Sequence, residues 1–233
     1  NCAHSSRSLR TMPESSNPLA EQHSPRILVR VATQLAVLLP PFVQTIARHW
    51  LALANLFLGL QAALPFLAPY LMHSGHTPAG NLLYRIYGPL CHQLPERSLF
   101  LFGPQWTYTL QQLTQHVGND VPLRYIGDAT IGFKTTVCLR DLATYLAMWV
   151  AGLAFAFLRH HLRPLSLRAF VLLCLPIAID GFGQLLTMWD STPLSRTITG
   201  TLFGLACVWL AFPAIDSAMM SLQRSLASSD QSP

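Results

Sequence analysis

Side chains that bind metals or anions are concentrated in two short runs of this otherwise apolar sequence. The run "LCHQLPERSLFLFG" contains Cys91, His92 and Arg97. The run "VCLRD" contains Cys138, Arg140 and Asp141. Residues three positions apart share one face of a helix, so Cys138 and Asp141 can point together at a group from the first run. The candidate ligands for zinc or another transition metal are therefore Cys91, His92, Cys138 and Asp141.

The pairing of the two polar cysteines is left open by the sequence. Cys91 and Cys138 bind a metal with their neighbours, form a disulfide if their compartment is oxidising, or remain two free thiols. Cys174 and Cys207 lie in apolar runs, where a cysteine usually acts as a small buried hydrophobe.

A carboxylate inside an apolar run is the next chemical feature. Asp180 lies in "AFVLLCLPIAIDGFGQLLTM", and Gln184 follows one turn later on the same helical face. A charge near the bilayer centre costs about 2.5 kcal/mol or more, so such a residue is normally paired, neutral or functional. Asp180 is either the partner of Arg140 or Arg196 in a buried pair, or a proton-transfer or ligand-binding group. The second interpretation makes it the candidate catalytic residue; exposure through a misplaced span is the third.

Three arginines and a glutamine could hold an anionic headgroup or substrate. These candidate ligand-binding residues are Arg97, Arg140, Gln184 and Arg196. Arg196 is followed by Gly200 and Gly204, and two small residues four positions apart allow helices to approach closely. The glycine pair therefore predicts a tight helix contact, within the chain or by self-association.

The composition indicates a membrane protein. Hydrophobic residues make up 51% of the chain and charged residues 11%, whereas soluble domains carry about 25% charged residues. The lipid bilayer is thus the first expected partner. Fifteen Lys and Arg outnumber ten Asp and Glu, but they are scattered along the chain, which argues against a nucleic-acid partner.

Four apolar runs are long enough to cross a membrane, which takes about 20 residues. They are Leu51–Leu71, Leu142–Leu158, Ala169–Met188 and Thr197–Ile215. The second is short unless Cys138 to Asp141 form its first turn, at the membrane surface. We expect an all-α membrane protein with about four transmembrane helices and one long extracytoplasmic loop between the first and second spans.

The segments outside the spans are assigned from composition. Residues 1–26 are rich in Ser and Pro and predict a disordered tail. Residues 27–45 are interrupted by Pro40 and predict an interfacial amphipathic segment. A polytopic domain over 46–216 and a tail over 217–233 complete the chain.

The charges of the short links predict the orientation, because Arg and Lys are retained on the cytoplasmic side. The link "RHHLRPLSLR" has three arginines and no acid, whereas "WDSTPLS" has Asp190 and no base. We expect both termini in the cytoplasm of a multi-pass cell-membrane protein. The long segment 73–137 would then lie outside, with both polar runs at the outer half of the membrane.

Four blocks of the sequence resemble a known family in their order and spacing. "CHQLPERSLFLFGPQWTYTL", "IGFKTTVCLRDLATYLA", "DGFGQLL" and "SRTITGTLFG" are similar to domain of unknown function family 2085, predicted bacterial and archaeal membrane proteins. The similarity runs from Tyr84 to Phe212. It singles out Cys91, His92, Arg97, Cys138, Arg140, Tyr145, Asp180, Gln184, Arg196 and Gly200.

Many relatives carry CxRC where this chain has "CLRD", so Asp141 replaces what is commonly a second cysteine. This departure weakens a CxxC redox interpretation. A metal interpretation is retained, because a carboxylate also binds zinc.

Two functions fit these features, and the sequence does not choose between them. One is a binding or catalytic site for a metal or an anionic ligand, open to the outer leaflet. The other is a non-enzymatic accessory or assembly subunit of a larger membrane complex, in which the polar residues hold helices together. A small transporter is a third interpretation, but only Asp180 and Gln184 are placed for a polar path through the bilayer.

Overall fold

The computed structural model describes residues 40–118, 120–186 and 189–229. The chain divides into two compact units, residues 1–45 and 46–233. The predicted tail and most of the predicted interfacial segment lie outside the described residues. Residues 40–45 of that segment form the start of helix α2, which begins at Pro40.

Four of the described helices are long and apolar enough to cross a membrane, which confirms the predicted all-α membrane fold. They are α2 (Pro40–His73), α5 (Leu139–Leu158), α6 (Leu167–Leu185) and α7 (Pro193–Ser229). Cys138 is the N-cap of α5, so Arg140 and Asp141 lie in its first turn as expected. Helix α7 continues to Ser229, through residues that were expected to form a separate tail.

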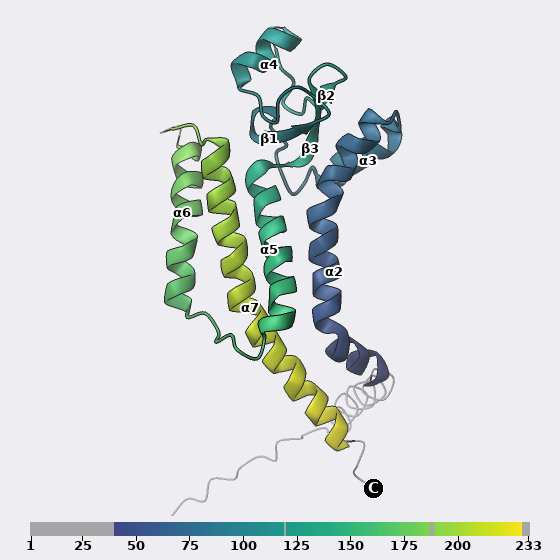
Figure 1. The fold of residues 1–233 in the computed structure, drawn as a ribbon, viewed down its shortest axis with the longest axis vertical. Helices are drawn as coiled ribbons and strands as arrows, with labels where there is room; N and C mark the ends of the chain where they lie inside the picture. Colours follow the sequence, from purple (N-terminus) through teal and green to yellow (C-terminus); the bar gives the residue numbers. More distant parts are fainter. Residues whose placement is uncertain (1–39, 119, 187–188, 230–233) are drawn as a thin grey trace, which may run out of the picture. The chain divides into compact units, whose positions relative to one another are not determined.

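Helices α5 and α7 pack closely along their length (Figure 1). A Cβ atom placed on Gly200 would collide with the backbone oxygen of Arg140, and one on Gly204 with that of Thr144. Thr144 Oγ1 also donates a hydrogen bond to the Gly200 oxygen at 3.1 Å. The close contact predicted from the glycine pair is therefore made within the chain. Of the two alternatives for this glycine pair, the contact within the chain is the one that the structure shows.

An aromatic cluster joins α2 to these two helices at the end away from the sheet. The ring centroid of Trp50 lies 6.4 Å from that of Phe155 and 5.4 Å from that of Phe212. Trp50 Nε1 donates a hydrogen bond to buried Asp216 at 3.2 Å. Asn55 Nδ2 donates to the Gly152 oxygen at 3.1 Å.

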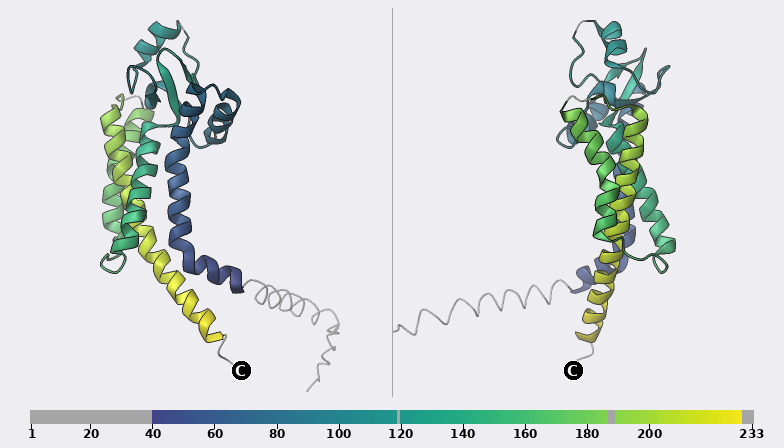
Figure 2. Two further views of the ribbon diagram at one scale, coloured as in Figure 1. Left: turned by 45° about the vertical axis from the view of Figure 1, so that its right-hand side comes forward. Right: turned by 90° about the vertical axis from the view of Figure 1, so that its left-hand side faces the viewer.

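The segment between α2 and α5, residues 74–138, is here called the cap. It contains α3 (Thr77–Tyr87), the 3-10 helix η1 (Pro95–Arg97), β1 (Ser98–Leu101), α4 (Leu110–Val117), β2 (Gly127–Asp128) and β3 (Gly132–Cys138). Figure 2 shows the cap at the end of the helices where α6 connects to α7. Tyr87 anchors it by donating a hydrogen bond to Gln61 of α2 at 2.8 Å.

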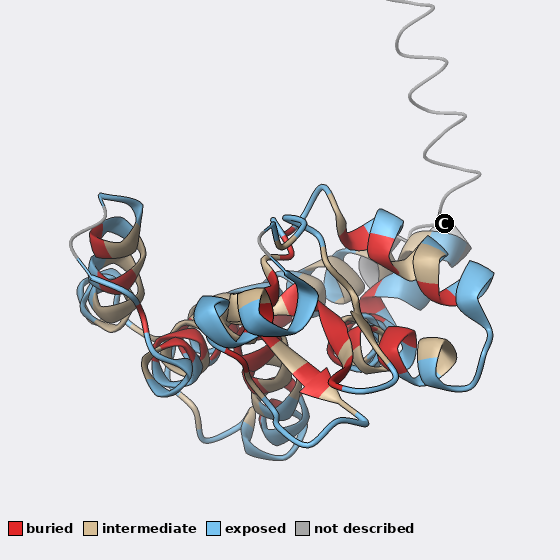
Figure 3. Cartoon of the chain, turned by 90° about the horizontal axis from the view of Figure 1, so that it is seen from above, coloured by how far each residue is buried: buried red, intermediate tan, exposed pale blue. Residues whose placement is uncertain are grey.

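The three strands form an antiparallel sheet in the order β1-β3-β2, which the all-α prediction did not include. The central strand β3 contains consecutive β-branched residues and is buried along most of its length (Figure 3). Ser98 at the start of β1 pairs with Cys138 at the end of β3. This register brings the chain before β1, residues 91–97, against the first turn of α5.

Candidate polar site

The sequence-predicted site residues meet around one cavity of about 250 Å³. It lies where the loop before β1, the start of α5, the end of α6 and the start of α7 come together. Its lining includes Cys91, His92, Arg97, Cys138, Arg140, Asp141, Gln184 and Arg196. Asp180 is not in the lining but contacts it through Arg140. The structure therefore places all nine candidates in one neighbourhood.

Two thiols and a carboxylate converge at this cavity. Atoms of Cys91, Cys138 and Asp141 that can bind a metal all lie within 4.8 Å of one another. Cys138 Sγ donates to Asp141 Oδ2 at 3.2 Å, and the Cys138 backbone N–H donates to Cys91 Sγ at 3.3 Å. Both cysteines are free thiols. His92 lines the cavity but is exposed and is not part of the convergent group.

The two thiols differ in acidity. Interaction with the neighbouring Cys138 side chain lowers the pKa of Cys91 below its usual value, and backbone N–H groups of Gln93 and Cys138 help to outweigh burial. The pKa of Cys138 is raised by the same interaction between the two thiols, then by burial and by the Asp141 charge. Cys91 is therefore the thiol that ionises first.

A buried network holds the loop that carries Cys91. Gln93 has a left-handed backbone with φ of 56°, which is uncommon outside glycine. Its side chain donates to the Tyr84 oxygen at 2.8 Å, and its carbonyl accepts a hydrogen bond from Lys134 Nζ. The Tyr84 hydroxyl donates to the Lys134 carbonyl. These contacts tie the loop to α3 and to β3, so the position of Cys91 is set by buried side chains.

The burial of Lys134 has an electrostatic consequence. Its side chain is 0% exposed, and desolvation lowers its pKa to about 8. The negative charges of Cys91 and Glu96 act in the opposite direction but do not outweigh the burial. Sequence reasoning missed Lys134, Gln93 and Tyr84. The one available signal was that Lys134 is the sole lysine among fifteen basic residues and lies inside a strand-like run.

Asp180 is committed to a buried ion pair with Arg140. Its carboxylate also accepts a hydrogen bond from Ser191 at 2.8 Å and one from Ser195 at 3.3 Å. Of the interpretations left open, the Arg140 pair is the one present in the structure. Asp180 lies within the last two turns of α6, which ends at Leu185.

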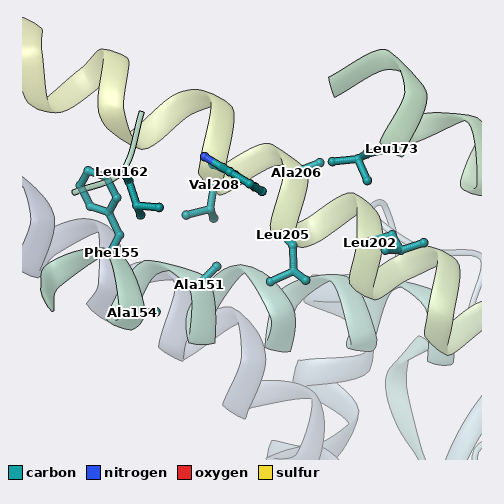
Figure 4. A pocket seen from close by; sticks show the side chains of 10 residues that line it. Ala151, Ala154, Phe155, Leu162, Leu173, Leu202, Leu205, Ala206 and Val208 are labelled. Carbon is teal, nitrogen blue, oxygen red and sulfur yellow. The ribbon is translucent and has the colours of Figure 1, made fainter. Parts of the chain in front are cut away.

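A second cavity, of about 440 Å³, lies between α5 and α7 on the side of α6 (Figure 4). Its lining is aliphatic and aromatic, including Phe155, Leu173 and Leu205. Trp209 contributes the one polar side-chain atom of this lining, and its indole N–H donates to the Arg163 oxygen. The lining offers no titratable group for chemistry, so the polar cavity is the candidate functional site.

Comparisons with known proteins agree with this architecture. Residues 129–210 match the model of a family described as a predicted membrane protein. An uncharacterised protein of Methanocaldococcus jannaschii, MJ1492, is 26% identical over 155 residues, covering 64% of this chain and 81% of the relative. No solved structure matches. The resemblance to domain of unknown function family 2085, a family of predicted membrane proteins, is thereby confirmed over residues 129–210, which include Cys138, Asp180 and Arg196.

Proposed function

We propose that this polytopic membrane protein binds one transition-metal ion, with zinc the best match, through Cys91, Cys138 and Asp141. The observation that carries the proposal is the convergence of two sulfurs and a carboxylate oxygen within 4.8 Å. Ligand atoms of a tetrahedral zinc site lie about 3.5 Å apart, so small side-chain rotations would close the site. A thiol of lowered pKa favours binding, because the thiolate is the ligand.

Three protein ligands leave a fourth position for water, a substrate atom or His92. Zinc sites with three protein ligands and an open position are typical of catalysis, whereas structural sites are usually closed by four. His92 would have to turn toward the cluster to close the site, since its exposed ring lies outside the convergent group. We assign Asp180 the role of positioning Arg140 rather than of transferring a proton.

Metal analysis of the detergent-purified protein by inductively coupled plasma mass spectrometry tests the proposal. We expect about one zinc per chain, lost in Cys91→Ala and in Cys138→Ala. Cys174→Ala is the matched control, because Cys174 lies within α6 away from the cluster, and it should keep the metal. Absence of metal, with two thiols that titrate only after reduction, would instead identify a Cys91–Cys138 disulfide.

The second candidate is an accessory or assembly subunit of a larger membrane complex. Helix α6 makes its main contacts with α7 and leaves Leu172, Ile179 and Phe182 exposed. In a membrane this face meets either lipid or a helix of another protein. Absence of metal with all thiols free, together with a stoichiometric partner after mild solubilisation, would favour this function.

We further propose that the polar cavity faces the outside of the cell. The α5–α6 link has Arg159 and Arg163, Arg168 follows in the first turn of α6, and the α6–α7 link has Asp190. Arginine-rich links are retained in the cytoplasm, which supports a cytoplasmic C-terminus and an outer cap. A green fluorescent protein fused after Pro233 should fluoresce, whereas alkaline phosphatase at the same point should be inactive. A dark fluorescent-protein fusion together with an active phosphatase fusion would place the C-terminus outside the cell and the cap in the cytoplasm.

A further inference from the structure

Arg196 is a buried cation without a carboxylate partner in the described part of the chain. It lies in the first turn of α7, its residue is 5% exposed, and it lines the polar cavity. Among the described residues its Nε has no hydrogen-bond partner, and its guanidinium donates only from Nη1 to the Glu96 carbonyl, at 3.5 Å. A buried guanidinium without a counter-charge is costly, so its retention needs an explanation.

The other two arginines of the cavity are paired differently. Arg140 forms an ion pair with Asp180 and also contacts Ser191 at 3.3 Å. Arg97 lies 3.6 Å from Glu96, and its side chain is 34% exposed. Arg196 is therefore the cation of this cavity whose charge is least compensated by the protein.

A second buried donor lines the same space. Gln184 Nε2, near the end of α6, has no hydrogen-bond partner among the described residues. Buried amide donors are nearly always paired, so an unpaired one in a cavity that also holds a guanidinium without a counter-charge indicates an absent acceptor. Arg196 and Gln184 come from different helices, and both border the same cavity of about 250 Å³.

We infer that this cavity binds a small oxyanion, a phosphate or carboxylate group, through Arg196 and Gln184. A guanidinium presents several parallel donors that suit the oxygens of such a group. The volume accommodates a small anion or a single headgroup phosphate, since sites for drug-sized ligands occupy about 300 Å³ or more. The inference extends the proposed function to a ligand of the same cavity, and it does not require the metal.

A neighbouring cavity of about 480 Å³ lies between the cap and the start of α7 and borders this anion site. Arg97 and Arg196 line both cavities. Glu96 and Asp190 also line the neighbouring cavity, so its two arginines are accompanied by two acids. The polar cavity, by contrast, has three arginines and the single acid Asp141 in its lining, and this excess of positive charge favours an anion there.

Thermal unfolding of the detergent-purified protein with inorganic phosphate tests the inference. With sodium chloride at matched ionic strength as reference, phosphate at ten times its Kd should raise the midpoint by about 3 to 5 °C. The shift should vanish in Arg196→Gln and Gln184→Leu. It should persist in Arg168→Gln, which removes an exposed arginine at the opposite end of the helices.

A second experiment distinguishes a lipid headgroup from free phosphate as the bound oxyanion. Protein is reconstituted in nanodiscs of phosphatidylcholine with phosphatidylglycerol, and retained lipid is measured by native mass spectrometry. Retention of one phosphatidylglycerol by the unaltered chain but not by Arg196→Gln, without a phosphate shift, would identify the headgroup as the oxyanion. A phosphate shift alone would identify a free anion. The absence of both effects would overturn the inference.

Two further measurements separate failure of the anion site from misfolding of the variant and from failure of the metal proposal. Without phosphate, Arg196→Gln should unfold at the same or a higher temperature, because it removes an uncompensated buried charge. A large fall in its midpoint would show a structural role and count against the inference.

Phosphate binding that survives metal removal by a chelator supports the anion site even where the metal content is zero. Metal retained by Arg196→Gln leaves the metal proposal intact if the anion site fails.

Discussion

Cys138 Sγ donates a hydrogen bond to Asp141 Oδ2 at 3.2 Å across the first turn of α5. The spacing of three residues at the start of a helix makes this contact local, so it depends little on the rest of the fold. Cys91 approaches the same point from the loop before β1, which the pairing of Ser98 with Cys138 holds in place. A local pair and one long-range residue thus form the cluster.

Changing the carboxylate of this pair should alter metal affinity in a predictable direction. Asp141→Ala removes one of the three proposed ligands and should weaken zinc binding about tenfold or more. Asp141→Cys creates the CxRC pattern of many relatives and should strengthen it, because thiolates are softer ligands. Competition with a chromogenic chelator measures both affinities. Asp120→Ala, which removes an exposed acid of the cap, is the control and should leave affinity unchanged.

The two thiols should react with alkylating agents at different pH. The pKa of Cys91 is lowered, chiefly by interaction with the Cys138 side chain, while that of Cys138 is raised. In metal-free protein, iodoacetamide should therefore modify Cys91 at a lower pH than Cys138, since the thiolate is the reactive form. Peptide mass spectrometry of samples quenched between pH 6 and pH 10 measures the order. Cys138→Ala should move the reaction of Cys91 to higher pH, and an unchanged profile would contradict the assigned cause.

Elements whose contacts are local were predictable from the sequence. The four spans follow from apolar length, and the Cys138–Asp141 pair follows from helical spacing. The Asp180–Arg140 pair was among the interpretations left open, because a buried carboxylate requires a partner. Whether Asp180 pairs with Arg140 or with Arg196 depends on how α5, α6 and α7 pack, and no single stretch of sequence determines that packing.

The buried network behind Cys91 could not be predicted in the same way. Gln93 and Lys134 are far apart in sequence, and their contact exists because β1 and β3 pair in one register. The strand pattern of β3 was hidden because the strand is buried on both faces and lacks polar alternation. The packing of Gly200 and Gly204 against α5 could not be predicted either, because the same spacing of small residues fits a helix contact within one chain or between two chains.

The ion pair at the opposite end of the helices should contribute to stability but not to binding. Asp216 accepts a hydrogen bond from Trp50 and lies 3.9 Å from an Arg159 nitrogen. Asp216→Ala would leave the Trp50 indole N–H unpaired and remove the counter-charge of Arg159, and it should lower the free energy of unfolding by about 1 to 3 kcal/mol. The midpoint of thermal unfolding in detergent should fall, with metal content unchanged. Asp190→Ala, an exposed acid, should leave the midpoint within experimental error.

Lys134 should give the protein a stability that rises with pH in a defined window. Its pKa is about 8 in the folded chain because of burial, against 10.5 for an unperturbed lysine. Between these values the unfolded chain binds a proton that the folded chain does not, so raising the pH stabilises the folded state. At about 1.4 kcal/mol per pH unit, the gain amounts to at most about 3 kcal/mol.

Lys134→Met removes this titration and provides the measurement. The unfolding midpoint of the unaltered chain, minus that of Lys134→Met, should increase steadily from pH 7.5 to pH 10. Taking the difference cancels the contributions of thiols and tyrosines, which ionise in the same range in both proteins. Arg85→Met, an exposed change on α3, should give a difference that is independent of pH. A constant difference for Lys134→Met would mean that the buried ammonium carries no desolvation penalty, and the network that holds Cys91 would then need another electrostatic explanation.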